Sequence, residues 1–106
     1  MKCKIIKRPS SAVVSMLRRK MPDAAARQSL EERRIESVGI CQGSVLEILV
    51  ASDIAEKTAG VVVGEVSGSC PQHMTCMAVL GDTGAVRAAM EAVELELGTV
   101  KKVREE

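Results

Sequence analysis

Two cysteines and the only histidine of this 106-residue sequence lie close together, in the stretch that ends at Cys76. Cys70, His73 and Cys76 follow the spacing C-x2-H-x2-C, and thiolates and imidazoles are ligands for zinc and for iron–sulfur clusters. A structural zinc site takes about four ligands, so three in one chain do not complete it. We expect Cys76 to be a buried strand cysteine, as free cysteines commonly are, and we expect the same of Cys3 and Cys41.

The chemistry of this stretch then depends mainly on Cys70. It precedes Pro71, which fixes the local backbone, and cysteine–proline pairs also occur among the cluster ligands of ferredoxin-type motifs. Gly68 and Ser69 keep the loop small. One thiolate per chain holds no cluster, but a cyclic oligomer would bring one Cys70 from each subunit to a common point. Three roles stay open for His73: a ligand, a hydrogen-bond donor to a cluster sulfur, or a side chain in solvent.

Composition and motifs exclude several other classes of protein. The sequence has no aromatic residue and a net charge of +1, which argues against nucleic-acid binding. It shows no signal peptide and no apolar run of about 20 residues, so we expect a cytoplasmic protein that does not span a membrane. An enzyme with Cys70 as nucleophile and His73 as base would need a third orienting residue. None accompanies them, so we predict that the protein is not an enzyme.

Apolar patterns predict an α+β fold in one domain. Strands are predicted at residues 3–6, 35–41, 61–66, 75–80 and 99–103. Helices are predicted to begin after Ser10, Ser44 and Asp82, and Ser44 with Glu47 has the pattern of a capping box. Gly60 and Gly98 are expected to end the second and third helices. The apolar stripes expected to face the core are Val13, Val14, Met16 and Leu17; Leu46, Leu49, Val50 and Ile54; and Val86, Ala89, Met90, Val93 and Leu97.

Together, several of these segments resemble the domain of bacterial microcompartment shell proteins. The resemblance covers Ser37 to about Gly98, and its strongest part is the run Gly81-Asp82-x-Gly84-Ala85-Val86-x-Ala88-Ala89. Family members usually carry a last strand and an arginine-proline step after this helix. Here the matching piece, Ile5-Ile6-Lys7-Arg8-Pro9-Ser10, stands at the N-terminus.

The chain therefore resembles a circularly permuted shell domain, a four-stranded and mainly antiparallel sheet packed against helices. Residues 1–22 would be the relocated strand and helix, and residues 23–34 an exposed helix or connector. Residues 35–103 would form the strand-helix-strand-strand-helix-strand core. Permutation is tolerated where chain termini lie close together at the surface.

The resemblance also implies a function, that of a structural shell subunit forming a cyclic homohexamer. The family's pore loop falls on Ser69, Cys70, Pro71, Gln72 and His73. This form is similar to shell proteins of glycyl-radical-type microcompartments, some of which bind an iron–sulfur cluster at the pore. We expect a [4Fe–4S] cluster, at most one per hexamer, used for electron transfer across the shell or for cluster delivery.

Two further expectations come from the same resemblance. Lys57 and Arg8 match residues along hexamer–hexamer edges, so other shell proteins are expected partners, and enclosed enzymes are further candidates. The alternative function is a metal-free pore, lined by Cys70 and His73, that passes small polar metabolites.

Overall fold

Four strands form one sheet in the order β1-β2-β4-β3, and every neighbouring pair is antiparallel. The computed structural model describes residues 1–32, 35–58, 60–68 and 74–105, with side chains described as far as Leu97. The strands are β1 (Lys2–Lys7), β2 (Ser37–Ser44), β3 (Val61–Glu65) and β4 (Met74–Gly81). This arrangement confirms the predicted α+β class and the antiparallel sheet.

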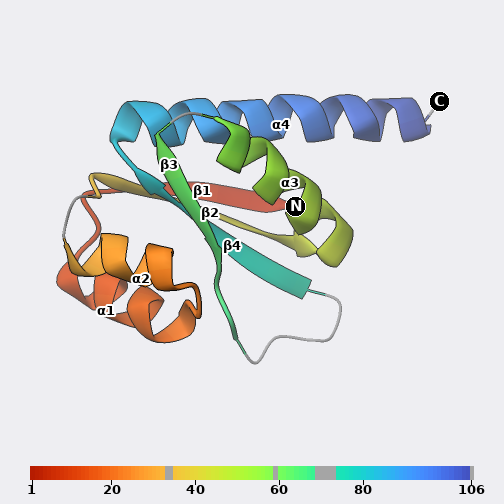
Figure 1. Ribbon diagram of the computed structural model, residues 1–106. Helices are drawn as coiled ribbons and strands as arrows, with labels where there is room; N and C mark the ends of the chain where they lie inside the picture. Colours follow the sequence, from red (N-terminus) through yellow and green to blue (C-terminus); the bar gives the residue numbers. More distant parts are fainter. Residues whose placement is uncertain (33–34, 59, 69–73, 106) are drawn as a thin grey trace.

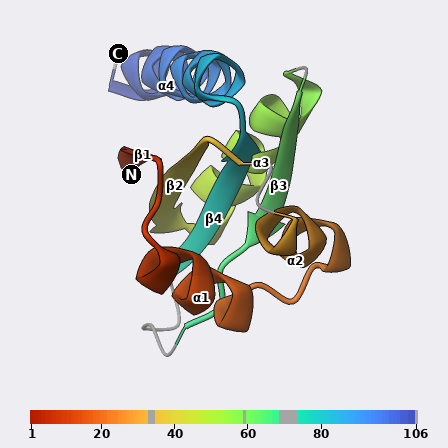
Figure 2. The same cartoon turned by 90° about the vertical axis from the view of Figure 1, so that its left-hand side faces the viewer.

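Two pairs of helices cover opposite faces of the sheet (Figures 1 and 2). The helices are α1 (Ser11–Lys20), α2 (Ala24–Glu31), α3 (Val45–Lys57) and α4 (Thr83–Glu105). Strand side chains alternate between faces, so Met77 and Val79 of β4 pack with α3 and α4. Ala78 and Leu80 belong to the second core, with α1 and α2.

The predicted helix starts are confirmed, since α1, α3 and α4 begin directly after Ser10, Ser44 and Asp82, and Ser44 and Ser10 cap their helices. The Ser44 hydroxyl accepts a hydrogen bond from the Glu47 backbone N–H at 3.2 Å, and the Glu47 carboxylate accepts one from the Ser44 N–H at 3.0 Å. Ser10 caps α1 by accepting from the Val13 N–H at 3.3 Å. Gly60, just past α3, has φ of +85°, a backbone conformation that glycine adopts readily.

The apolar stripe predicted for α4 is confirmed, and it packs closely on the sheet. Val86, Ala89, Met90 and Val93 are buried. Met90 reaches Gly39 of β2, where an added Cβ would lie only 2.6 Å from the Met90 sulfur. Because Gly39 has no side chain, the Met90 side chain can pack directly against the backbone of β2.

The strand predicted at residues 99–103 and the helix end predicted at Gly98 are both wrong, because α4 continues to Glu105. Lysine, arginine and glutamate follow Gly98, and all three are good helix formers. A glycine within a helix costs about 1 kcal/mol, which a helix of 23 residues tolerates. The sheet has its fourth strand already, since β1 occupies the edge next to β2.

The predicted buried faces of α1, α2 and α3 need correction. In α3 the buried residues are Ile48, Ala51 and Ala55, whereas Leu46 and Leu49 point outward. Small alanines let this helix approach the sheet closely, which the larger leucines would prevent. Met16 of α1 is likewise exposed. The segment predicted to be an exposed helix or connector contains the helix α2. Its predicted exposure is wrong for Ala26 and Leu30, which are buried in the second core.

Candidate functional site

The segment with the candidate ligands connects β3 to β4, and hydrogen bonds fix both of its described ends. Glu65 pairs with Met77 in the strand register, and the Val66 N–H then donates to the Cys76 carbonyl at 2.9 Å. The Ser67 N–H donates to the carbonyl oxygen of Lys20, the last residue of α1, at 2.7 Å. The hairpin is thus held by its own ladder and by the end of a helix.

The predicted metal ligands Cys70 and His73, the predicted cofactor-binding residues Pro71 and Gln72, and the predicted pore residue Ser69 all lie outside the described residues. Gly68 is described and is exposed. The antiparallel register brings the two ends of the segment together at Val66 and Cys76. Cys70 and His73 fall in sequence between these two ends, and their roles as pore, metal or cofactor residues stay predictions.

The other three cysteines occupy different environments. Cys76 is a partly buried residue of β4, opposite Gln42 in the strand register, so its expected place in a strand is confirmed. Cys41 of β2 is fully buried, as predicted. Cys3 is exposed, so its predicted burial is wrong. It lies in β1, an edge strand whose residues are mostly exposed.

The two predicted edge residues both lie at the surface. The Lys57 ammonium forms an ion pair with Asp53 at 2.9 Å, and this contact raises the pKa of Lys57. Arg8 adopts φ of +48°, a left-handed conformation that is uncommon for a residue with a side chain. Its N–H donates to the Glu36 carbonyl at 2.8 Å, which fixes the turn between β1 and α1. Their part in contacts between hexamers stays a prediction.

An exposed apolar face on α3 was missed by the sequence analysis. Leu46 is 67% exposed and Leu49 is 64% exposed. Beside them, a groove of about 600 Å³ lies between the helix and the hairpin, with Val63 and Thr75 in its wall. The signal for the true inner face was the helical spacing of Ile48, Ala51 and Ala55. That spacing assigns the leucines to the outside.

Among the described residues, no three histidine, cysteine, aspartate or glutamate side chains gather closely enough to hold a metal ion. Within the same part of the chain, no helix combines the length and apolar character needed to cross a bilayer. The described surface includes the exposed apolar face of α3 and the charged residues Lys57 and Arg8.

Comparison with protein families gives one match, to the model of the BMC domain, over residues 37–105. None of the curated proteins matches the chain. The matched region begins at β2 and includes α3, the hairpin and α4. It leaves out β1, α1 and α2.

Several solved structures are similar over most of the chain. The ligand-free GrpU microcompartment shell protein from Pectobacterium wasabiae is 33% identical, with a TM-score of 0.69, covering 88% of this chain and 99% of that one. Its counterpart from Clostridiales bacterium 1_7_47FAA is 30% identical, with a TM-score of 0.65, and the match covers 89% of this chain and 88% of that one. A fused permuted hexameric shell protein of the RMM microcompartment shares the fold at 23% identity and a TM-score of 0.67, covering 92% of this chain and 45% of that one.

Proposed function

The chain belongs to the family of BMC-domain microcompartment shell proteins, and we propose that it forms a homohexamer whose central pore holds an iron–sulfur cluster on copies of Cys70. It is a structural subunit of the shell, and other shell proteins are its partners. The cluster would carry electrons across the shell or be delivered to enclosed enzymes.

The α3 face supports assembly into a ring. Large apolar side chains are exposed here, those of Val45, Leu46 and Leu49. Burying them against a neighbouring copy would stabilise an assembly. Val45 and Leu49 line the groove beside the hairpin strands, so a neighbouring copy seated there would lie beside β3 and β4, between which Cys70 falls in sequence. Cyclic symmetry then repeats the loop around one axis, because each subunit occupies an equivalent position. The observation that best supports the ring is therefore the apolar face of α3 beside the strands β3 and β4.

The N-terminal segment supports a circularly permuted order. The match to the family model begins at residue 37, yet β1 precedes it and pairs with residues 37–42 of β2. The strand at this sheet edge thus comes from the N-terminus. Arg8-Pro9 follows it, as the relocated arginine-proline step would, and α1 then packs on the sheet.

The donor chemistry fits an iron–sulfur cluster when several chains are combined. Cys70 supplies one soft thiolate per chain, and a [4Fe–4S] cluster takes about four, fewer than a hexamer supplies. Four thiolates out of six cannot obey six-fold symmetry, so such a cluster would break the symmetry of the ring, with at most one per hexamer. When bound, it would supply one-electron redox chemistry. Crowded thiolates without a metal would repel one another, which raises their pKa or favours disulfides on oxidation.

Anaerobic purification with iron and acid-labile sulfide analysis tests this proposal. We expect a coloured hexamer. Since the sequence has no tryptophan, tyrosine or phenylalanine, a near-ultraviolet band also belongs to a cofactor, as a visible band does. Cys70→Ser should lose iron, sulfide and colour but keep its native mass. Cys76→Ser, a change in the adjoining strand, is the matched control and should keep all of them.

Three results would contradict the proposal. An iron-free wild-type hexamer from iron-replete cells would favour the metal-free metabolite pore. Colour retained by Cys70→Ser would show that other residues are the ligands. A monomeric native mass would remove the pore itself.

A further inference from the structure

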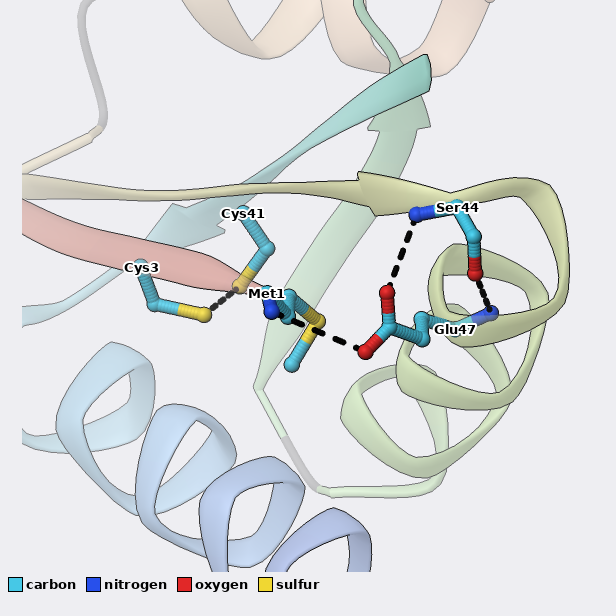
Figure 3. Close-up of polar contacts among 5 residues, drawn as sticks. All are labelled: Met1, Cys3, Cys41, Ser44 and Glu47. Carbon is cyan, nitrogen blue, oxygen red and sulfur yellow. Dashed lines mark hydrogen bonds and ion pairs between the residues drawn. The ribbon is translucent and has the colours of Figure 1, made fainter. Parts of the chain in front are cut away.

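A pair of thiols lies on the first two strands of the sheet. Cys3 of β1 and Cys41 of β2 are direct partners in the antiparallel register. Their sulfur atoms are 2.7 Å apart, and their side chains point toward each other between the strands (Figure 3). Opposite residues on antiparallel strands have Cβ atoms about 4.5–5.5 Å apart, so a disulfide would require only a small further approach.

The two thiols differ in access to solvent, and this difference gives each a role. Cys3 is exposed and can meet a reagent from solution. Cys41 is fully buried, with its sulfur 3.9 Å from the Met90 sulfur. Burial, followed by the hydrogen bond with Cys3, raises the pKa of the Cys41 thiol. A reagent therefore reaches Cys3 first, and Cys41 can react only with what is attached to Cys3.

We propose that Cys3 and Cys41 form a reversible cross-strand disulfide by exchange with a small-molecule disulfide of the glutathione class. The Cys3 thiolate attacks one sulfur of that disulfide, which forms a mixed disulfide and releases one thiolate. The Cys41 thiol then attacks the Cys3 sulfur, and its proton passes to the departing thiolate, which leaves as the second small thiol. Two protein thiols are oxidised, and one small disulfide is reduced to two thiols.

The bond would tie the N-terminal strand to the part of the chain that matches the family model. β1 is an edge strand whose backbone pairs with β2 alone, and it precedes the matched region that begins at residue 37. At its start, the Met1 ammonium is 3.6 Å from the Glu47 carboxylate, which holds the strand near the buried thiol (Figure 3). A covalent link would fasten the segment that leads to α1.

Peptide mapping after treatment with oxidised glutathione tests the pairing. The full-length protein, reduced and then oxidised, should give a peptide pair linked through Cys3 and Cys41, and dithiothreitol should reverse it. The same link should form in Cys70→Ser, which separates this site from the proposed pore cluster. Cys3→Ser should leave Cys41 as a thiol, and Cys41→Ala should leave Cys3 as a glutathione adduct.

Thermal unfolding followed by circular dichroism gives a second readout. Oxidation should raise the melting temperature of the wild type by on the order of 10 °C, and Cys3→Ser, a surface change, should show no rise. A stable glutathione adduct on wild-type Cys3, with Cys41 still a thiol, would overturn the proposal. The proposal would also be overturned if Cys3 and Cys41 formed disulfides with other cysteines but not with each other.

Discussion

The Ser67 backbone N–H donates a 2.7 Å hydrogen bond to the carbonyl oxygen of Lys20, the last residue of α1. A helix leaves its final carbonyl groups without partners inside the helix, so this contact satisfies one of them. It also joins α1, which precedes the family match, to the described residues that follow β3.

Removing the Ser67 donor should weaken this junction. Ser67→Pro has no backbone N–H, so we expect its free energy of unfolding to fall by about 1 kcal/mol more than that of Ser67→Ala, which keeps the donor. Denaturant unfolding followed by far-ultraviolet circular dichroism measures both. Equal stability of the two variants would show that the hydrogen bond to Lys20 contributes nothing.

A side chain at position 39 should destabilise the core. In Gly39→Ala the new Cβ would meet the Met90 sulfur at 2.6 Å, so Met90 must shift, at a cost of about 1–3 kcal/mol. Gly84→Ala is the matched control, because its Cβ would meet nothing within 4 Å and alanine favours the helix by about 1 kcal/mol. Chemical denaturation should therefore move the two variants in opposite directions, and a stable Gly39→Ala would contradict the close packing.

The Glu47 carboxylate should make stability depend on acid pH. Its hydrogen bond from the Ser44 N–H lowers its pKa below the usual 4.5. The carboxylate therefore stabilises the fold above about pH 4.5, and this contribution is lost as the pH falls through the lower, folded-state pKa. Glu47→Gln should melt below the wild type at pH 7, with the difference shrinking toward pH 3. A difference that stays constant with pH would contradict this assignment.

Polar residues on the exposed face of α3 should prevent assembly without unfolding the chain. Leu46→Gln and Leu49→Gln remove exposed side chains, so we expect the protomer's unfolding free energy to change by no more than about 0.5 kcal/mol. Native mass should shift from the ring to smaller species. Met16→Gln, at an exposed apolar residue of α1 away from the groove, is the control and should stay assembled. Intact rings in the double leucine variant would place the interface elsewhere.

Sequence patterns predicted the features of the fold that local chemistry sets. The capping box of Ser44 and Glu47 marked the start of α3, and the stripe that includes Val86 and Val93 identified the inner face of α4. Unbroken apolar runs at residues 61–66 and 75–80 predicted the two strands of the hairpin. Each of these signals depends on neighbours within a few positions, so one sequence is enough to find it.

The errors arose where distant segments decide the outcome. Leu46 and Leu49 fit an apolar stripe, yet the sheet accepts the smaller Ala51 and Ala55. Residues 99–103 could form a strand, but β1 already occupies that edge of the sheet. For the candidate site, the position of the hairpin could be predicted. The contact of Cys3 with Cys41 could not, since it requires the register between β1 and β2.

Native mass spectrometry of the anaerobically purified full-length protein tests the central claim most directly. The account predicts a hexamer, a part of whose population carries the added mass of one [4Fe–4S] cluster. It also predicts that Cys70→Ser gives the hexamer mass alone. A wild-type hexamer without added mass, isolated from iron-replete cells, would contradict the cluster, and a wild-type monomer would contradict the ring that gathers the Cys70 thiolates.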